Sequence, residues 1–406
     1  MIILTYIFYI SATILAFFLV FPFLTTVAGL FTKNDLKVGV QNKENTNYDY
    51  ANIITAYGNV DIAKALVLSL IKQTHENHHI YLVADNADIS NWDILHPKFT
   101  MIVPSTPLNL KVKSIIRATE LFVRRHDYTV IWDADNLAHP QFLEHINYYA
   151  NAGAKAIQGQ RTAKNVDTRF AAADALGEFY KNYIERYLPP KLGSSTVISG
   201  SGMAVKTNLY NSYLYSEAIE KGKHLGKKMM QEDKILQNHI IRVGHRIVYA
   251  KDAICFDEKI TDASQVETQR SRWLYSYFQN LPNSIGFILR GVFNFNWNTF
   301  FFGLITVAPP LFILVGLSSA CFLLGLWLNP LISRLLAVCL CIFAGNIFLT
   351  LHLSNAPRQV FLSLLALPLF VFKQFMALFK MANPTKNFKH SEHKIATSID
   401  DMLKDT

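Results

Sequence analysis

The stretch from Ile2 to Phe31 constrains the chain most, because it is almost wholly apolar and carries no charged side chain. A helix of about 20 apolar residues crosses a bilayer, so this stretch is long enough to span a membrane. A cleaved signal peptide has basic residues before a shorter apolar core, whereas here Lys33 and Lys37 come after the apolar stretch. The pattern predicts a retained transmembrane anchor at residues 1–31, with its N-terminus outside and the following residues in the cytoplasm.

The last third of the chain is apolar again and predicts further membrane segments. The stretches Thr299–Leu328 and Leu331–Leu351 are each long enough to span a bilayer. Residues 274–297 are rich in aromatic side chains and poor in charge, which predicts an interfacial segment. We expect transmembrane and interfacial helices within residues 298–380, and a basic cytoplasmic tail at residues 381–406.

The number of membrane crossings depends on residues 360–380, which Pro368 interrupts. An outside N-terminus with a cytoplasmic catalytic domain and a cytoplasmic tail requires an odd number of crossings. We therefore expect three spans, with residues 360–380 as a re-entrant or interfacial helix. Four spans with the tail outside is the alternative. Both arrangements predict a multi-pass protein of the inner or plasma membrane.

The middle of the chain has a different pattern. Residues 32–50 are polar and predict a linker, whereas residues 51–273 alternate short apolar runs with amphipathic stretches. The expected elements in chain order are the strand Asn52–Tyr57, the helix Asp61–Lys72, the strand His79–Ala84, the helix Ile115–Arg125 and the strand Tyr128–Trp132. This alternation predicts an α/β domain with a mostly parallel sheet and helices on its faces.

Composition excludes several classes of protein. The formal net charge is +9, but no arm or run rich in Lys and Arg is present, which argues against binding to nucleic acid. Basic flanks of membrane helices explain the excess more simply. The four cysteines are Cys255, Cys321, Cys339 and Cys341. They form no paired C-x-x-C pattern, so we predict neither a disulfide framework nor a zinc site, as suits a reducing compartment.

Asp133 and Asp135 directly follow the strand predicted to end at Trp132. Ligands of open α/β sheets bind beyond the carboxyl ends of the strands. Two neighbouring carboxylates at that position suit a hard divalent cation that also takes oxygens from a diphosphate. Such a cation would neutralise charge on a departing nucleotide. A D-x-D triplet also arises by chance, and Asn136 and Pro140 fit the alternative of a simple turn or helix cap.

Two further acidic positions have both a functional and a structural interpretation. Asp85 follows a predicted strand, and it would either accept a hydrogen bond from the imide of a uracil base or form an Asx-turn. Glu232 and Asp233 begin an amphipathic stretch, where acidic residues are common helix caps. The functional alternative is a general base that removes the proton of an attacking sugar hydroxyl.

The segment Gln269-Arg-Ser-Arg-Trp273 precedes the second apolar region. Basic and aromatic residues at such a position commonly form a membrane-interface belt. In the functional interpretation, Arg272 neutralises a diphosphate and Trp273 stacks on a sugar ring. The loop Ser199-Gly-Ser-Gly202 offers backbone that a substrate can approach closely, and its alternative is an ordinary loop.

In their chain order, these features resemble the family 2 glycosyltransferases with a GT-A fold. The resemblance is to the membrane-integrated group that includes cellulose, chitin and hyaluronan synthases. It covers residues 50–280 and continues into the membrane layout. The sequence departs from the family at Gly58-Asn59-Val60, where Asn-Glu is common, and at Gln231, which replaces the Thr of T-E-D. The membrane part is also shorter than that of the largest polymer synthases.

The resemblance implies a mixed, mostly parallel GT-A sheet and a role for each motif residue. The implied catalytic residues are Asp233, as the base, and Glu232, and the implied metal ligands are Asp135 and Asp133. The implied donor-binding residues are Tyr57, Asp85, Lys113, Asp133 and Arg272. The implied acceptor-binding residues are Gly200, Ser201, Gly202, Gln269 and Trp273. The stretch after D-x-D is matched by Gln158, Arg161, Lys164 and Asn165, and a gating tail segment by Thr385 and His390.

These implications predict an inverting hexosyl- or N-acetylhexosaminyl-transferase that uses a UDP-sugar and Mg²⁺ or Mn²⁺. The expected partners are the nucleotide-sugar donor, a carbohydrate or lipid-linked acceptor, the bilayer and export or assembly proteins. The leading hypothesis is extension of a polysaccharide. The alternatives are transfer of one sugar to a lipid-linked acceptor and an inactive membrane scaffold with a glycosyltransferase-like domain.

Overall fold

The chain forms two compact units in a computed structural model that describes residues 2–32, 46–224, 231–259, 263–366, 371 and 398–404. The sheet unit comprises residues 36–165, 195–259 and 390–406, and the helical unit comprises residues 1–35, 166–194 and 260–389. Residues 166–194 and 260–273, which lie inside the predicted catalytic stretch 51–273, thus fall in the helical unit.

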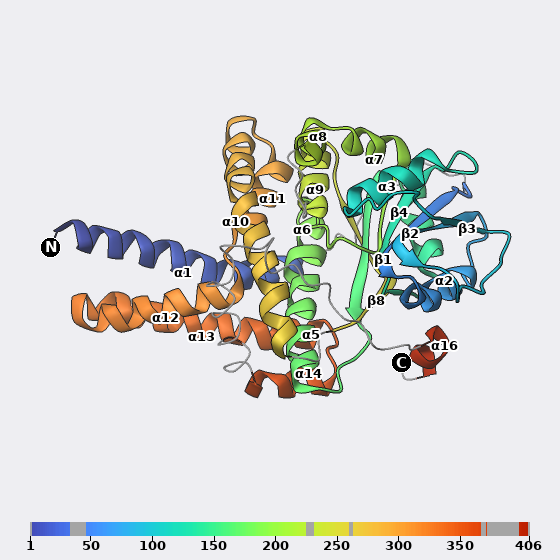
Figure 1. Cartoon of the computed structure of the whole chain (residues 1–406). Helices are drawn as coiled ribbons and strands as arrows, with labels where there is room; N and C mark the ends of the chain where they lie inside the picture. Colours follow the sequence, from blue (N-terminus) through green and yellow to red (C-terminus); the bar gives the residue numbers. More distant parts are fainter. Residues whose placement is uncertain are drawn as a thin grey trace. The chain divides into compact units, whose positions relative to one another are not determined.

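The sheet unit alternates strands with helices along the chain (Figure 1). Its strands are β1 (Tyr50–Asn59), β2 (His78–Asp88), β3 (Phe99–Ile102), β4 (Tyr128–Asp133), β5 (Leu137–Ala138), β6 (Ala156–Ala163), β7 (Met203–Lys206) and β8 (Val248–Asp257). Its helices are the 3-10 turn η1 (Asp61–Ala63), α2 (Lys64–Ile71), α3 (Lys111–Glu120), α4 (Phe142–Asn151), α7 (Thr207–Leu214), α8 (Glu217–His224), α9 (Glu232–Arg242) and α16 (Ile399–Lys404).

The eight strands form one sheet in the order β3-β2-β1-β4-β7-β6-β8-β5. The pairs β2–β3, β1–β2, β1–β4 and β6–β8 are parallel, whereas β4–β7, β6–β7 and β5–β8 are antiparallel. The prediction of a mixed, mostly parallel α/β sheet is therefore confirmed. In this order, β1 and β4 lie side by side inside the sheet, and their shared register brings Thr55 of β1 beside Asp133, the last residue of β4.

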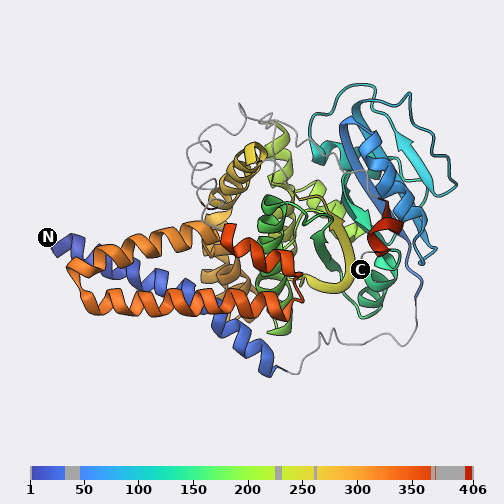
Figure 2. The same cartoon turned by 90° about the horizontal axis from the view of Figure 1, so that it is seen from below.

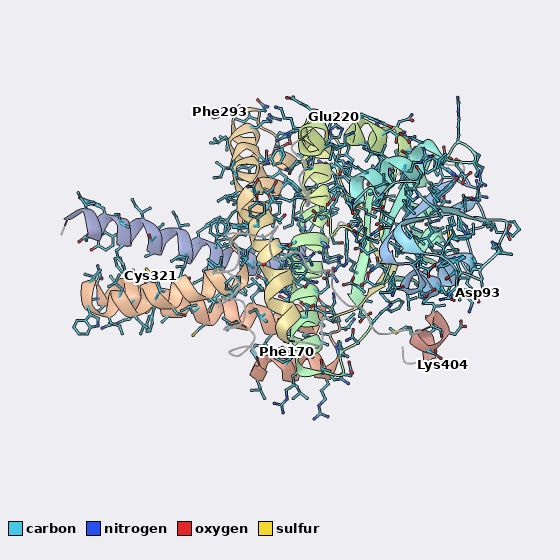
Figure 3. All side chains as sticks on the ribbon, in the orientation of Figure 1. Asp93, Phe170, Glu220, Phe293, Cys321 and Lys404 are labelled. Atoms are coloured by element: carbon cyan, nitrogen blue, oxygen red, sulfur yellow. The ribbon has the colours of Figure 1, made fainter. Side chains whose placement is uncertain are left out.

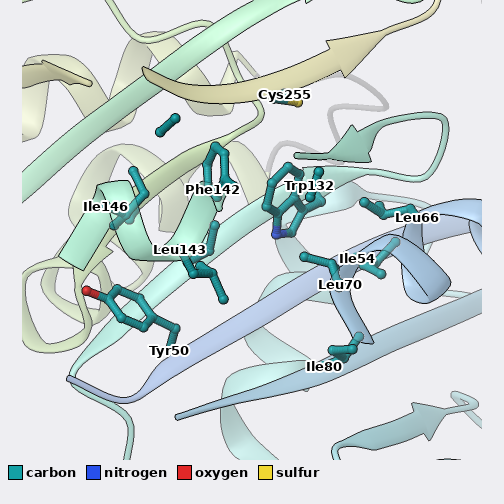
Figure 4. Close-up of a cluster of buried hydrophobic side chains, with 14 of the residues drawn as sticks. Tyr50, Ile54, Leu66, Leu70, Ile80, Trp132, Phe142, Leu143, Ile146 and Cys255 are labelled. Carbon is teal, nitrogen blue, oxygen red and sulfur yellow. The ribbon is translucent and has the colours of Figure 1, made fainter. Parts of the chain in front are cut away.

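The core of the sheet unit lies between the central strands and the helices α2 and α4 (Figure 4). Trp132 is fully buried, and its ring centroid lies 4.7 Å from that of Phe142. The indole N–H of Trp132 donates a hydrogen bond of 3.0 Å to the side-chain oxygen of Asn52, so its polar group is satisfied inside the core. Full burial of each large apolar side chain contributes about 1.5–3 kcal/mol. The core therefore holds the end of β4 rigidly in place.

The helical unit contains the apolar segments (Figures 1 and 3). Its elements are α1 (Ile2–Phe31), α5 (Arg169–Lys181), the π-helical turn η2 (Asn182–Tyr187), α6 (Leu188–Lys191), α10 (Ala263–Phe293), α11 (Trp297–Val307), α12 (Leu311–Leu328), α13 (Pro330–Leu353), α14 (Arg358–Leu362) and the 3-10 turn η3 (Ser363–Ala366). Helices α1, α12 and α13 lie side by side (Figure 2). Figure 3 labels Cys321 on α12 and Phe293 at the end of α10.

Three of the described helices are long and apolar enough to cross a membrane: Thr5–Phe31, Leu311–Leu328 and Pro330–Leu353. The stretch Thr299–Leu328 contains one such span, α12, but it is not one continuous helix, because α11 ends at Val307 and α12 begins at Leu311. Pro309 and Pro310 account for the break, since proline lacks the backbone N–H that a helix interior needs and disfavours helix in the residue before it.

The bounds of two other elements differ clearly from the predictions. The helix predicted at Ile115–Arg125 runs from Lys111 to Glu120, and the strand predicted at His79–Ala84 extends to Asp88. Asp85 therefore lies within β2 rather than after it. Several predicted features fall outside the described residues: most of the linker, most of residues 360–380, Thr385 and His390.

Candidate functional site

Asp133 is the last residue of β4, and Asp135 lies in the turn that follows. Asn136 closes this turn: its buried side-chain oxygen accepts from the backbone N–H of Asp133 at 3.0 Å, and its backbone N–H donates to the carbonyl of Asp133 at 3.1 Å. The turn interpretation is thus correct. The side chain of Asp133, at the carboxyl end of β4, is 37% exposed, whereas Asp135 is buried.

Lys111 is the cation that faces Asp133. Its ammonium group lies 2.5 Å from a carboxylate oxygen of Asp133, and it also reaches the carbonyl of Gly200 at 3.5 Å. Burial lowers the pKa of Lys111, but the charges of Asp133 and then of Glu232 and Asp233 outweigh burial and raise it above its ordinary value. Lys111 therefore carries a firmly held positive charge beside the aspartate.

Lys111 was not among the predicted site residues, and a role of Lys113 in donor binding stays a prediction. Lys111 and Ile115 are four residues apart on α3, so they share one face of the helix. Lys113 lies on another face and is exposed. The prediction started the helix at Ile115, which hid this periodicity. A predicted helix that began at Lys111 would have placed Lys111 on the same face as Ile115 and so would have identified it.

A second cluster of charged side chains, which contains Lys164, Arg161 and Asp257, lies next to the turn that holds Asp135. The ammonium group of Lys164 donates to the backbone carbonyl of Asp135 at 2.5 Å, and burial lowers the pKa of Lys164 although Asp135, Glu258 and Asp257 oppose this effect. Asp257 ends β8 and accepts from Arg161 at 2.8 Å.

Asp257 also binds the turn itself, since the amide nitrogen of Asn136 donates to its other oxygen at 3.2 Å. Asp257 was not among the predicted site residues. The run Ile254-Cys-Phe-Asp257 repeats the pattern of an apolar strand that ends in aspartate, as Ile131-Trp-Asp133 does. That repeat was the available signal.

The residues predicted to bind the nucleobase of the donor lie together near the ends of β1 and β2. Tyr57 donates its hydroxyl to the side-chain oxygen of Asn109 at 2.9 Å, and the amide nitrogen of Asn86 donates to the Tyr57 hydroxyl at 3.3 Å. The buried carboxylate of Asp85 accepts from the backbone N–H groups of Leu108 and Asn109, both at 2.8 Å. Asp85 is thus no Asx-turn: it anchors the loop before α3. Its contact with a base stays a prediction.

Glu232 and Asp233 begin α9 and line a pocket of ≈ 150 Å³. The residues that line the pocket are Lys111, Ile115, Ile131, Gly200, Met203, Tyr210, Glu232 and Asp233. Burial raises the pKa of Glu232 to about 7, although the charge of Lys111 opposes the shift. One pocket therefore contains two acids and the cation that pairs with Asp133.

The glycine loop lies against this pocket. Gly200 has a φ of 89°, and a Cβ placed there would lie 3.9 Å from the Cβ of Asp233. A Cβ at Gly202 would lie 2.8 Å from the Cβ of Cys255, so no side chain fits at that position. The amide of the fully buried Gln158 holds the loop by donating to the carbonyls of Ser201 at 3.0 Å and Gly202 at 3.2 Å.

Gln269, Arg272 and Trp273 lie on α10, in the helical unit. Burial lowers the pKa of Arg272. Trp273 stacks against Arg270, whose guanidinium carbon lies 4.3 Å from the ring centroid. Arg270 in turn forms an ion pair with Asp174 of α5. Roles of Gln269, Arg272 and Trp273 in acceptor or diphosphate binding stay predictions.

Across the residues that the structure describes, no three His, Cys, Asp or Glu side chains are grouped so that they hold a metal ion by themselves. The candidate cation ligands are therefore the two hard carboxylates Asp133 and Asp135. This donor set fits a cation that takes its other oxygens from a diphosphate.

A model of the family described as "Glycosyltransferase like family 2" matches residues 48–276. No curated protein sequence matches the chain. Among solved structures, the chain is similar to the mannosyltransferase PcManGT from Pyrobaculum calidifontis in complex with GDP-Man and Mn²⁺, with a TM-score of 0.54 and 12% identity, over 92% of this chain and 99% of that one. This similarity shows the fold alone.

A second solved structure is TarS from S. aureus, which matches with a TM-score of 0.38 and 13% identity. The match covers 55% of this chain and 38% of TarS.

Proposed function

The chain belongs to the family 2-like glycosyltransferases, and on this premise we propose that it is an inverting membrane enzyme. It moves a sugar from a nucleotide-sugar donor, of which UDP-sugars are the leading class, onto a growing polysaccharide. The three helices long enough to cross a bilayer support a multi-pass protein of the inner or plasma membrane. The catalytic domain then faces the cytoplasm, where nucleotide sugars are made.

One observation carries the proposal: Lys111 lies beside both the predicted cation ligand and the predicted catalytic acids. Its ammonium group pairs with Asp133 at the end of β4, and it lines the same pocket as Glu232 and Asp233. Glycosyl transfer needs positive charge beside a departing diphosphate and a base beside an attacking hydroxyl. The pocket offers both within one set of side chains.

Asp233 is the proposed base. Its carboxylate accepts from the backbone N–H of Lys234 at 2.8 Å, which fixes its orientation, and the nearby Gly200 leaves room for an acceptor. A sugar hydroxyl has a very high pKa, so a positioned carboxylate accelerates its attack on the anomeric carbon by removing the proton. The pKa of Glu232 is raised to about 7, so below that pH this side chain is mostly protonated and cannot accept a proton, and we assign it to shaping the charge of the pocket.

Asp133 and Asp135 would hold Mg²⁺ or Mn²⁺, with Asp135 as the more direct ligand. A bound cation would neutralise charge on the diphosphate. Lys111 would then exchange its contact with Asp133 for a diphosphate oxygen, which is electrostatic stabilisation by a group already in place. Similarity in fold to an enzyme solved with GDP-Man and Mn²⁺ supports testing guanosine donors as well as uridine donors.

Tyr57 and Asp85 are the proposed contacts of the donor's nucleobase, and Arg272 is the proposed contact of its diphosphate. The loop Gly200–Gly202, with Gln269 and Trp273, is the proposed acceptor side. Export or assembly proteins remain proposed partners of a polymer product.

The test is a panel of UDP- and GDP-sugars with Mg²⁺ or Mn²⁺, scored for released nucleoside diphosphate and for product size. We expect release with one donor, and a loss of about 10²- to 10⁴-fold in the Asp233→Asn variant. Asp252→Asn is the matched control, because Asp252 is an exposed carboxylate on β8. Turnover that Asp233→Asn leaves unchanged would contradict the mechanism, and no release with any donor would favour the inactive scaffold.

A second candidate function is transfer of one sugar to a lipid-linked acceptor. Three helices in the described residues are long enough to cross a bilayer, and one chain with so short a membrane part would by itself build a narrow channel for a polymer. Product length separates the two functions. A ladder or high polymer from a single donor supports polysaccharide extension, and one discrete product supports the second candidate.

A further inference from the structure

The helix α16 (Ile399–Lys404), close to the end of the chain, packs on the sheet unit beside α2 (Figures 1 and 2). With six residues it is too short to be stable by itself, so its position depends on packing. Ser398 caps it: the hydroxyl accepts from the backbone N–H of Asp401 at 3.2 Å and donates to that residue's carboxylate at 2.6 Å.

Ile399 is the buried anchor of this helix, with 2% of its surface exposed. It forms a small cluster with Leu137 of β5 and Phe256 of β8, both fully or almost fully buried, and Met402 packs against the same cluster. This cluster is separate from the main core of the sheet unit. A change at Ile399 therefore acts locally rather than on the whole fold.

An ion pair fixes the orientation of the helix. The carboxylate of Asp400 lies 2.5 Å from the ammonium group of Lys72, which follows α2 directly. Both side chains are largely exposed, so this pair adds little stability and mainly selects one docking geometry.

The two residues that Ile399 covers are chain neighbours of the candidate cation site. Leu137 directly follows Asn136, whose side chain closes the turn of Asp133 and Asp135. Phe256 directly precedes Asp257, which accepts from Asn136 at 3.2 Å. Leu137 and Phe256 are also paired partners of the strands β5 and β8.

The strand β5 is only two residues long and lies at the edge of the sheet. Pairing on one side alone holds such a strand weakly, and natural proteins commonly cover an edge with a helix. The docked α16 supplies such a cover over Leu137.

We propose that Ile399 is a positioning residue for the cation site: the docked α16 holds Leu137 and Phe256 so that the turn Asp133–Asn136 keeps its geometry. This inference rests on the proposed function, because it assigns the turn to cation and diphosphate binding. It makes the end of the chain, which follows the membrane segments, a part of the donor site.

The test compares Ile399→Asp with Leu403→Asp in the full-length protein. Leu403 is the matched control, because it lies on the same helix and is 38% exposed. Hydrogen–deuterium exchange of residues 133–138 and Mn²⁺ binding by electron paramagnetic resonance are measured in both. We expect Ile399→Asp to speed this exchange and to weaken Mn²⁺ binding by about 10- to 100-fold, with a raised donor KM and a smaller change in kcat. Leu403→Asp should match the wild type.

A charge exchange gives a second, milder test. Lys72→Asp should speed the same exchange, and Lys72→Asp combined with Asp400→Lys should restore it. Faster exchange in Ile399→Asp with unchanged Mn²⁺ affinity would overturn the proposal, and so would equal effects in Leu403→Asp. A wild type that binds no Mn²⁺ overturns it as well. Turnover of nucleotide sugars by the wild type tests the proposed function separately.

Discussion

In the sheet unit, a carboxylate lies beside basic side chains at each end of the strand pair β1 and β4. The two carboxylates differ in how many partners they contact. β1 and β4 begin together, at the paired residues Tyr50 and Tyr128. Asp49 precedes β1 at this amino end, whereas Asp133 closes β4 at the carboxyl end. The comparison separates an acid that holds the fold together from an acid available to a ligand.

Asp49 is fully engaged. Its carboxylate accepts from Arg124 at 2.5 Å and 3.1 Å and from the ring of His126 at 2.9 Å. Burial raises the pKa of Asp49, but the hydrogen bonds and charges of His126 and Arg124 outweigh burial and lower it to about 2. The other ring nitrogen of His126 is bonded to the hydroxyl of Tyr81 at 2.8 Å, so both ring nitrogens of this buried histidine have partners.

Asp133 is more open. Its side chain is 37% exposed against 12% for Asp49, and the only side-chain cation recorded for it among the described residues is Lys111. A single flexible ammonium group can turn to a diphosphate, whereas the Arg124–His126 arrangement cannot release Asp49 without exposing buried polar groups. The two acids therefore differ in the number of cationic partners that their carboxylates contact, not in their charge.

The largest expected effect is on stability at the amino end. Asp49→Ala leaves Arg124 and the buried His126 without their carboxylate, so we expect the free energy of unfolding to fall by about 3–5 kcal/mol. Chemical denaturation in detergent measures this change. Nucleotide-sugar turnover per folded molecule should stay at the wild-type level, and a loss of turnover without a loss of stability would reverse the comparison.

The next effect is on catalysis at the carboxyl end. Lys111→Met keeps the length of the side chain and removes its charge, so turnover should fall by about 10²- to 10³-fold. Stability should change by less than about 1 kcal/mol, because Asp133 remains partly exposed to water. Steady-state kinetics and thermal unfolding of the same preparation check both results. Full activity in Lys111→Met would show that Asp133 needs no positive partner.

A third prediction uses the pH dependence of the two ends, which has opposite signs. The folded pKa of Asp49 is below its ordinary value, so its contribution to stability is present above about pH 4 and is lost as the pH falls toward 2. The folded pKa of Glu232 is about 7, above its ordinary 4.5, so stability falls as the pH rises through this window.

Glu232→Gln should therefore raise the Tm at pH 8 by about 2–4 °C and leave it unchanged below pH 4.5. Glu76→Gln, at an exposed position, is the control and should show no such pH dependence. A Tm difference at pH 8 no larger than that of Glu76→Gln would contradict the assigned burial of the Glu232 charge.

The smallest effect concerns Lys113, the donor-binding residue that the resemblance implied. Its side chain is exposed on α3, so Lys113→Ala should change both stability and turnover by no more than about 0.5 kcal/mol, or roughly twofold. A loss as large as that of Lys111→Met would restore the original assignment. Parallel kinetics of the two lysine variants measure the difference.

The sequence predicted the sheet and the D-x-D turn because both follow from local patterns. Apolar strands alternate with amphipathic helices, and Asp133 follows directly on the run that ends at Trp132. Such signals need only a few neighbouring residues. The family resemblance added the order of the motifs, and Gly200, Glu232 and Asp233, which it assigned to the acceptor side and to catalysis, line one pocket.

The partners of these residues were not predictable, because they depend on packing between distant segments. Lys111 meets Asp133 only when the start of α3 is known to within two residues, and Asn136 meets Asp257 across more than a hundred residues of chain. The break between α11 and α12 was different: Pro309 and Pro310 were visible in the sequence, and high hydropathy concealed their effect.

The comparison depends on the proposal that Asp133 and Asp135, at the carboxyl end, bind the donor. The most direct measurement is release of nucleoside diphosphate by Asp135→Asn and Asp49→Asn, with the Tm of each variant determined in the same preparation. We predict that Asp135→Asn loses at least about 10²-fold in release and keeps its Tm, whereas Asp49→Asn keeps its release per folded molecule and loses Tm. Wild-type release by Asp135→Asn would contradict the account.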